Sequence, residues 1–196
     1  DFSDVQWNGA GETTALDRLL TGNHVRARMV IHEWNRLSGD ARATKAIVFC
    51  VSVNHARFMT EQFEKVGLPV VCLTGDSSDV ERREAPQRLA RGEVCAIVTV
   101  DLYNEGVDIP SADTLLFLRP TQSALVFQQQ LGRGLRLSDG KESCLVLDFV
   151  GRHRSDFRFD KLISSVTGLS RREVLKGLEE GFSTLPSGCH IHLEAQ

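Results

Sequence analysis

Two hydrophobic periods alternate along this chain between residues 46 and 149, and this alternation restricts the fold more than any other feature. Short runs rich in β-branched residues are separated by segments with helical spacing or by loops. Such an order predicts a parallel α/β sheet with right-handed crossovers. The expected strands are AIVFCV (46–51), PVVCL (69–73), VCAIVT (94–99), TLLFL (114–118) and SCLVLDF (143–149), the first of them buried on both faces.

Helices are expected before, between and after these strands. One begins with a capping box, Ser78 with Glu81, and Pro86 inside it predicts either a kink or a later start. Another begins with a second capping box, Ser170 with Glu173. The expected apolar helix faces are Val30, Trp34 and Leu37 within residues 13–38; Ala56, Met59, Phe63 and Val66 after the first strand; and Val174, Leu175, Leu178 and Phe182 near the end.

Composition and charge exclude several classes of protein. Hydrophobic residues make up 41% and charged residues 25%, as in ordinary globular proteins. The net charge of −3 means that any nucleic-acid binding would use a few placed cations rather than a basic surface. No apolar run approaches the roughly 18 residues of a membrane span, and no signal peptide opens the chain. We therefore expect a cytoplasmic protein without a membrane partner.

The start of the chain and its cysteines suggest how it is organised. The acidic opening DFSDV lacks Met and is typical of a linker, so we expect a part of a longer protein. Residues 1–20 would be this linker, residues 21–150 the α/β domain, and residues 151–196 a helical extension. The five cysteines are scattered and form no C-x-x-C pair, which favours buried free thiols in a reducing compartment.

Polar residues and glycines gather where the expected strands end. In an open parallel sheet, ligands bind outside these carboxyl ends. The loops there are SVNHA (52–56), TGDSS (74–78), VDLYNEGVDIP (100–110) and RPTQ (119–122). Beyond them, Arg133 and Arg136 lie three residues apart, so on a helix they share a face, and their forked donors suit phosphoryl oxygens. A solvated arginine face is the alternative. Likewise Asp108 suits ribose hydroxyls, or it caps a turn.

Together these stretches resemble a known family. IVFCVS, TGD, TVDLYNEGVDIP and QQLGRGLR occur in the order of the C-terminal half of a superfamily-two helicase core, over about residues 45–150. The resemblance implies a RecA-like parallel sheet sandwiched by helices. It also implies an ATP cleft shared with an N-terminal RecA-like domain, and nucleic acid crossing the top of both. The glutamines of the last motif and NEG before Val107 are closer to DNA translocases than to RNA helicases.

The resemblance also implies roles for individual residues. Arg133 and Arg136 would be arginine fingers on the γ-phosphate of ATP. Three further residues would bind ATP: Gln129, which would also link it to the nucleic acid, Gly106, and Asp108 on the ribose. Ser52, Gly75 and Thr99 would contact nucleic acid. Many relatives have a threonine against the backbone phosphate at the position of Val100. Thr99 is one residue away, so in a strand it points to the opposite face.

The missing motifs define the expected function. The sequence contains no G-x-x-x-x-G-K-[ST] loop and no acidic motif for Mg²⁺, which both belong to the N-terminal domain of the family. We therefore expect half of an ATP-dependent DNA helicase or translocase, inactive alone, whose Mg²⁺ the other domain holds. The main alternative is a non-catalytic module that docks nucleic acid or protein. A flavodoxin-like small-molecule enzyme is disfavoured because no G-x-G-x-x-G follows the first strand.

Some conspicuous residues receive ordinary interpretations. Arg82 and Arg83 are expected on a solvated helix face, and Trp34 in the core. CHIH (189–192) offers three metal ligands without a fourth, so no metal site is predicted there. The basic and aromatic stretch RHRSDFRF (152–159) is expected to be a packed and solvated junction rather than a nucleic-acid contact.

Overall fold

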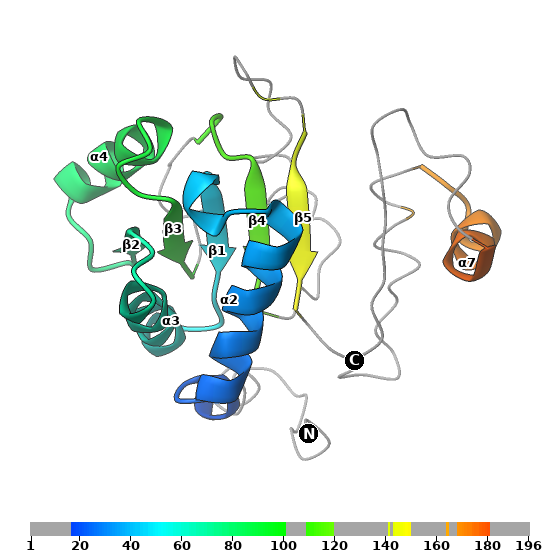
Figure 1. Cartoon of the computed structure of the whole chain (residues 1–196), viewed down its shortest axis with the longest axis horizontal. Helices are drawn as coiled ribbons and strands as arrows, with labels where there is room; N and C mark the ends of the chain where they lie inside the picture. Colours follow the sequence, from blue (N-terminus) through cyan, green and yellow to red (C-terminus); the bar gives the residue numbers. More distant parts are fainter. Residues whose placement is uncertain are drawn as a thin grey trace. The chain divides into compact units, whose positions relative to one another are not determined.

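A computed structural model describes residues 17–100, 109–119, 141, 143–149, 164 and 168–180, with only the backbone for 178–180 (Figure 1). The chain divides into two compact units. The first comprises Asp1–Pro120 and Arg133–His153, and the second Thr121–Gly132 and Arg154–Gln196. The predicted boundaries at residues 20 and 150 stay predictions.

A parallel five-stranded sheet forms the centre of the first unit, as the alternating pattern predicts. Its strands run in the order β2-β3-β1-β4-β5. All four residues of the central strand β1 are buried, so the prediction of a strand covered on both faces is confirmed. The bounds are Ala46–Phe49 for β1, Val70–Leu73 for β2, Ala96–Thr99 for β3, Thr114–Phe117 for β4 and Leu145–Asp148 for β5.

Two helices cover one face of this sheet. Helix α2 (His24–Ser38) crosses in front of the sheet in Figure 1, and α3 (Val53–Lys65) lies beside it. Trp34 of α2 and Phe63 of α3 are both completely buried and meet edge to face, with ring centroids 5.5 Å apart. Trp34 is therefore a core residue, as predicted. Other members of this core are Val30, Ala56, Met59, Val48, Val98 and Leu116.

The opposite face of the sheet is apolar and buried as well. Side chains alternate along a strand, so Ile47 and Phe49 point away from the core residues Ala46 and Val48. Phe49 stacks on Phe117 of β4, with ring centroids 5.0 Å apart. Helix α4 (Asp79–Ala90) contacts β2 and β3. The sheet and its helices thus form the predicted α/β fold.

Helix ends differ from the sequence pattern more than strands do. The expected helix over 13–38 is interrupted: Gly22 has a positive φ of 83°, and the Asn23 side chain caps a new start by accepting from the Arg26 N–H. Leu37 and Val66, both expected on apolar helix faces, are 43% and 54% exposed. Leu37 lies in the last turn of α2, and Val66 is the residue that caps the end of α3.

Both predicted capping boxes are present. Ser78 and Glu81 exchange hydrogen bonds at the start of α4, which begins at Asp79 and runs through Pro86, so a later start is ruled out. In the second unit, Ser170 and Glu173 do the same before α7 (Arg171–Glu180). Of the expected apolar face of α7, Val174 is buried and Leu175 is 44% exposed, while the Leu178 side chain and Phe182 lie outside the described residues.

The cysteines in the described part of the chain differ in burial. Cys50 and Cys95 are buried free thiols, as predicted, whereas Cys72 and Cys144 are only partly buried. Cys189 lies outside the described residues, as do Trp7, the stretch 152–159 and CHIH (189–192). Among the residues that the structure describes, no helix is both long and apolar enough to cross a bilayer.

Candidate functional site

The carboxyl edge of the sheet carries the predicted nucleic-acid contacts that the structure describes. All five strands are parallel, so the segments that follow them emerge at one edge. Ser52 follows β1, Gly75 follows β2, and Thr99 is the last residue of β3. Gly106, Asp108, Gln129, Arg133 and Arg136 lie outside the described residues. Their predicted roles in ATP binding and catalysis therefore stay predictions.

Ser52 caps helix α3 and is partly exposed. Its backbone is extended, and its Oγ accepts a hydrogen bond from the His55 N–H at 3.0 Å. The same hydroxyl donates to a carboxylate oxygen of Asp17. Ser52 thus lies at the positive end of a helix dipole, where an anionic oxygen is favoured. In this structure the Asp17 carboxylate supplies that oxygen.

Asp17 was not anticipated as part of this edge. Its carboxylate also accepts from the Thr21 hydroxyl at 2.9 Å and from the Asn54 side-chain amide at 3.4 Å. Burial raises the pKa of Asp17, but the hydrogen bonds from Ser52, Thr21 and Asn54 together outweigh it and hold the pKa below its ordinary value. The sequence places Asp17 in a linker, and no local signal links it to a serine 35 positions away.

His55 lies just inside this edge and is 2% exposed. The Val51 N–H donates to its Nδ1 at 3.3 Å, so the neutral ring carries its proton on Nε2. Burial lowers the pKa of His55 to about 4, and the nearby Arg26 charge adds to this effect. His55 is therefore uncharged at neutral pH and supplies no cation to the site.

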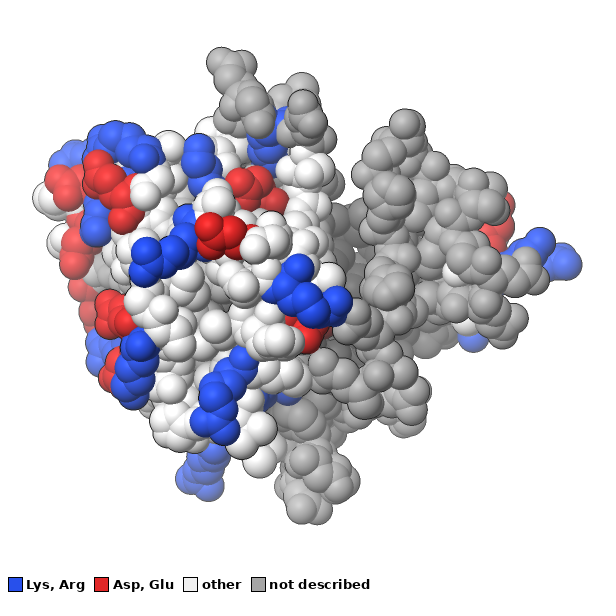
Figure 2. Space-filling model, in the orientation of Figure 1, with Lys and Arg blue, Asp and Glu red and all other residues white. Residues whose placement is uncertain are grey.

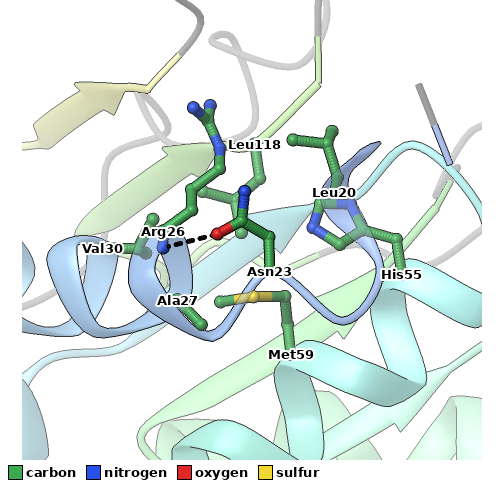
Figure 3. A pocket seen from close by; sticks show the side chains of 8 residues that line it. All are labelled: Leu20, Asn23, Arg26, Ala27, Val30, His55, Met59 and Leu118. Carbon is green, nitrogen blue, oxygen red and sulfur yellow. Dashed lines mark hydrogen bonds between the residues drawn. The ribbon is translucent and has the colours of Figure 1, made fainter. Parts of the chain in front are cut away.

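A small pocket between α2 and α3 adjoins His55 (Figure 3). Its polar groups come from Asn23, Arg26 and His55, and apolar side chains such as Met59 surround them. The Asn23 side chain accepts from the Arg26 N–H at 3.0 Å, and the Arg26 guanidinium donates to the Phe149 carbonyl. Arg26 thereby joins the start of α2 to the end of β5.

The loop after β2 is held by an arginine from the next helix. Arg82 donates to the carbonyls of Thr74 at 3.0 Å, Gly75 at 2.9 Å and Ser77 at 2.9 Å. The expectation that Arg82 is a solvated residue is therefore wrong, while Arg83 is exposed as expected. Gly75 is exposed with open space around the position of a Cβ atom, so its backbone is accessible.

Thr99 is completely buried at the end of β3, and among the described residues its hydroxyl has no hydrogen-bond partner. Alternation along β3 turns Thr99 into the sheet face that also carries Ile97. The predicted nucleic-acid contact of Thr99 stays a prediction.

Arg119, which follows β4, links two segments of this edge that are not neighbours in the sheet. Its Nη1 donates to the Val100 carbonyl at 2.9 Å. Because β1 lies between β3 and β4, the side chain reaches across the end of the central strand. The carboxyl edge therefore combines the hydrogen-bonded carboxylate of Asp17, the accessible loop at Gly75 and the hydrogen bond from Arg119 to the Val100 carbonyl.

Charge on the rest of the first unit is mixed. Figure 2 shows acidic and basic side chains interspersed over the described part of the visible face. This distribution agrees with the net charge of −3 and with binding through a few placed groups.

Comparisons with known proteins give a consistent result. Residues 28–138, more than half of the chain, match the family described as the helicase conserved C-terminal domain. The chain is 33% identical over 152 residues to irc3 of Schizosaccharomyces pombe, by name a candidate mitochondrial ATP-dependent helicase; the match covers 74% of this chain and 25% of that protein. It is 28% identical over 166 residues to the DNA 3'-5' translocase XPB2 of Sulfurisphaera tokodaii, covering 82% of this chain and 36% of that protein.

A solved structure supports the fold. The C-terminal domain of the DEAD-box protein Dbp5 superposes with a TM-score of 0.60 at 17% identity, over 76% of this chain and 83% of that one. The chain spans about a quarter of the length of the first curated relatives, 25% and 22%.

Proposed function

The chain belongs to the helicase conserved C-terminal domain family of superfamily-two helicases, and from this premise we propose that it works as the second RecA-like half of an ATP-dependent DNA helicase or translocase. The observation that carries the proposal is the match over residues 28–138. That range contains every residue for which a role was predicted. ATP would bind in the cleft between this domain and a first RecA-like domain.

On the ATP side, Arg133 and Arg136 would stabilise negative charge that develops on the γ-phosphate during transfer. Arginine suits this role because it stays ionised and its forked donors match phosphoryl oxygens. Asp108, with Gly106 before it, would accept hydrogen bonds from the ribose. Gln129 would couple bound nucleotide to bound nucleic acid. Mg²⁺ and the phosphate loop would come from the first domain, because this sequence lacks both motifs.

On the nucleic-acid side, Ser52 and the Gly75 loop would contact the backbone, whereas the buried Thr99 offers less support for such a contact. The accessible Gly75 backbone and the capping position of Ser52 at the start of α3 support this assignment. A DNA substrate is favoured because a relative at 28% identity is named as a DNA translocase.

ATP would then act by closing and opening the cleft. Its γ-phosphate would draw the two arginines and so bring the two domains together, while hydrolysis would remove that link. The grip on the strand would shift between the two states. Ser52 and the Gly75 loop follow two strands of one parallel sheet, so they would move together with that sheet.

The first test is DNA-stimulated ATP hydrolysis by the full-length protein, wild type against Arg136→Ala. Loss of an arginine finger is expected to lower turnover roughly 10³-fold, with DNA binding retained. Arg83→Ala is the matched control, since Arg83 is exposed on α4. Equal turnover in wild type and Arg136→Ala, or no turnover in wild type, would favour a non-catalytic docking module.

A further inference from the structure

Arg57 of α3 connects the two segments that carry Ser52 and Gly75. It follows Ser52, the capping residue of α3, by five positions, which is a rise of about 7.5 Å along a helix. Its Nη2 lies 3.5 Å from a carboxylate oxygen of Asp76, the residue after Gly75. One guanidinium thus starts from the helix that Ser52 caps and ends at the loop that contains Gly75.

Arg57 also shares a side of α3 with a residue at the start of this helix. Asn54 precedes Arg57 by three positions, so the two side chains lie on the same side of the helix, and both residues are exposed. The Asn54 amide donates at 3.4 Å to the Asp17 carboxylate, which also accepts from the Ser52 hydroxyl. Arg57 therefore lies on the side of α3 where an anionic group is already bound.

The ion pair between Arg57 and Asp76 is too exposed to contribute much to the fold. The two side chains are 61% and 82% exposed, and such pairs add little to stability because water screens them. The loop has a stronger attachment, since Arg82 donates three hydrogen bonds to its carbonyls. The Arg57 guanidinium can therefore exchange its carboxylate partner for another anion at small cost to the structure.

A backbone phosphate is the anion that suits this position. The forked donors of arginine match phosphoryl oxygens as well as carboxylate oxygens, and the charge of arginine persists at any physiological pH. The net charge of −3 means that this chain binds a polyanion only through cations at particular places. Arg57 is such a cation, because it is exposed and lies at the carboxyl edge of the sheet.

We propose that Arg57 is a further nucleic-acid contact, whose guanidinium exchanges the Asp76 carboxylate for a backbone phosphate of single-stranded DNA. The inference rests on the proposed function, in which Ser52 and the Gly75 loop contact the same backbone. Asp76 acts as the competitor that occupies Arg57 when DNA is absent. Phosphate contacts carry no sequence information, so Arg57 contributes affinity for any sequence.

The test measures Kd for a labelled single-stranded oligonucleotide by fluorescence anisotropy, on the full-length protein and at several salt concentrations. Arg57→Met is expected to bind roughly 5- to 10-fold more weakly at low salt, because it loses a charge-assisted contact. The slope of log K against log salt is expected to become shallower by about 0.7, the value of one phosphate on a single strand. Arg57→Lys keeps the charge and is expected to keep most of the wild-type slope.

Asp76→Asn separates a phosphate contact from a role in holding the loop. If Arg57 binds phosphate, this variant removes the competing carboxylate, and the Kd is expected to fall roughly 2- to 5-fold. If Arg57 only holds the loop, Asp76→Asn and Arg57→Met break the same ion pair, and both weaken binding. The two roles therefore predict opposite signs for Asp76→Asn.

A second exposed ion pair supplies the matched control. Arg91 and Glu93 lie 2.6 Å apart, are 58% and 48% exposed, and precede β3 at the amino edge of the sheet. Arg91→Met and Glu93→Gln make the same changes of charge away from the predicted DNA path. Each is expected to change the Kd less than about twofold, because salt screens distant charges.

Each result supports or overturns the inference. It is overturned by a wild-type Kd and slope in Arg57→Met, by weaker binding in Asp76→Asn, or by equally large effects at Arg91 and Glu93. A wild-type protein that does not bind single-stranded DNA overturns it together with the nucleic-acid part of the proposed function. Arg136→Ala with wild-type turnover overturns the motor function alone, since the Kd values of the Arg57 variants do not depend on it.

Discussion

Removing the Asp17 carboxylate is expected to strengthen nucleic-acid binding while it weakens the fold. Asp17 holds the hydroxyl of Ser52 and the side-chain amide of Asn54, two donors at the start of α3. If Ser52 contacts the nucleic-acid backbone, a phosphate oxygen must compete with this carboxylate for the same hydroxyl. Asp17→Ala releases both donors and removes a negative charge from the path of the phosphate.

The size of each effect follows from the geometry. A phosphate bound at the Ser52 hydroxyl and the Asp17 carboxylate that it displaces would lie roughly 5 Å apart, where like charges repel by about 1 kcal/mol in a solvent-exposed setting. That energy corresponds to a Kd about fivefold lower in the variant at low salt. Asp17 is partly exposed, so solvent screening reduces the stability that its hydrogen bonds contribute to about 1 kcal/mol.

Fluorescence anisotropy of a labelled single-stranded oligonucleotide measures Kd, and urea unfolding measures stability, both on the full-length protein. Asp40→Ala is the matched control: Asp40 also caps a helical turn through its carboxylate, but it precedes β1 at the amino edge of the sheet. The gain in affinity should shrink as salt rises, because salt screens exposed charges. Unchanged or weaker binding in Asp17→Ala, with the protein folded, would refute a backbone contact at Ser52.

Two other predictions concern groups near the same edge. The pKa of His55 is about 4 in the folded protein and about 6.5 in the unfolded chain, so the unfolded state takes up the proton first as pH falls. Urea unfolding should therefore show that the free energy of unfolding falls by up to about 3 kcal/mol between pH 7.5 and pH 4.5. In His55→Gln this free energy should change less with pH. Arg82→Met removes three hydrogen bonds to the loop around Gly75. Fluorescence anisotropy should then show that the affinity for single-stranded DNA is roughly 3- to 10-fold weaker. The control variant Arg83→Met should bind as the wild type does. Equal binding by both arginine variants would mean that this loop lies off the nucleic-acid track.

The strands were predictable because their signal is local. A four-residue run such as Ala46–Phe49 is apolar at every position, and only a strand covered on both faces buries such a run within so short a length. The capping boxes were predictable for the same reason, since Ser78 and Glu81 lie three positions apart and satisfy each other.

Helix ends were less predictable because burial there depends on what packs beyond the last turn. Leu37 and Val66 continue the apolar spacing of their helices, yet both are exposed. The spacing fixes the direction of each side chain but not the extent of the neighbouring surface. At the other end of α2, the turn at Gly22 and the cap at Asn23 interrupt the expected helix between the helical residues 17–20 and the start of α2 at His24.

The contacts that shape the candidate site depend on strand order, which the sequence pattern leaves open. Arg119 and Val100 lie 19 positions apart, on segments that follow different strands, and they meet because β1 is inserted between β3 and β4. With β3 and β4 adjacent, backbone pairing would satisfy the same carbonyl. The hydrogen bond from Arg119 to Val100 is therefore a consequence of the strand order. A family motif identifies the residues that touch the ligand, whereas the order of the strands determines which other residues hold them in place.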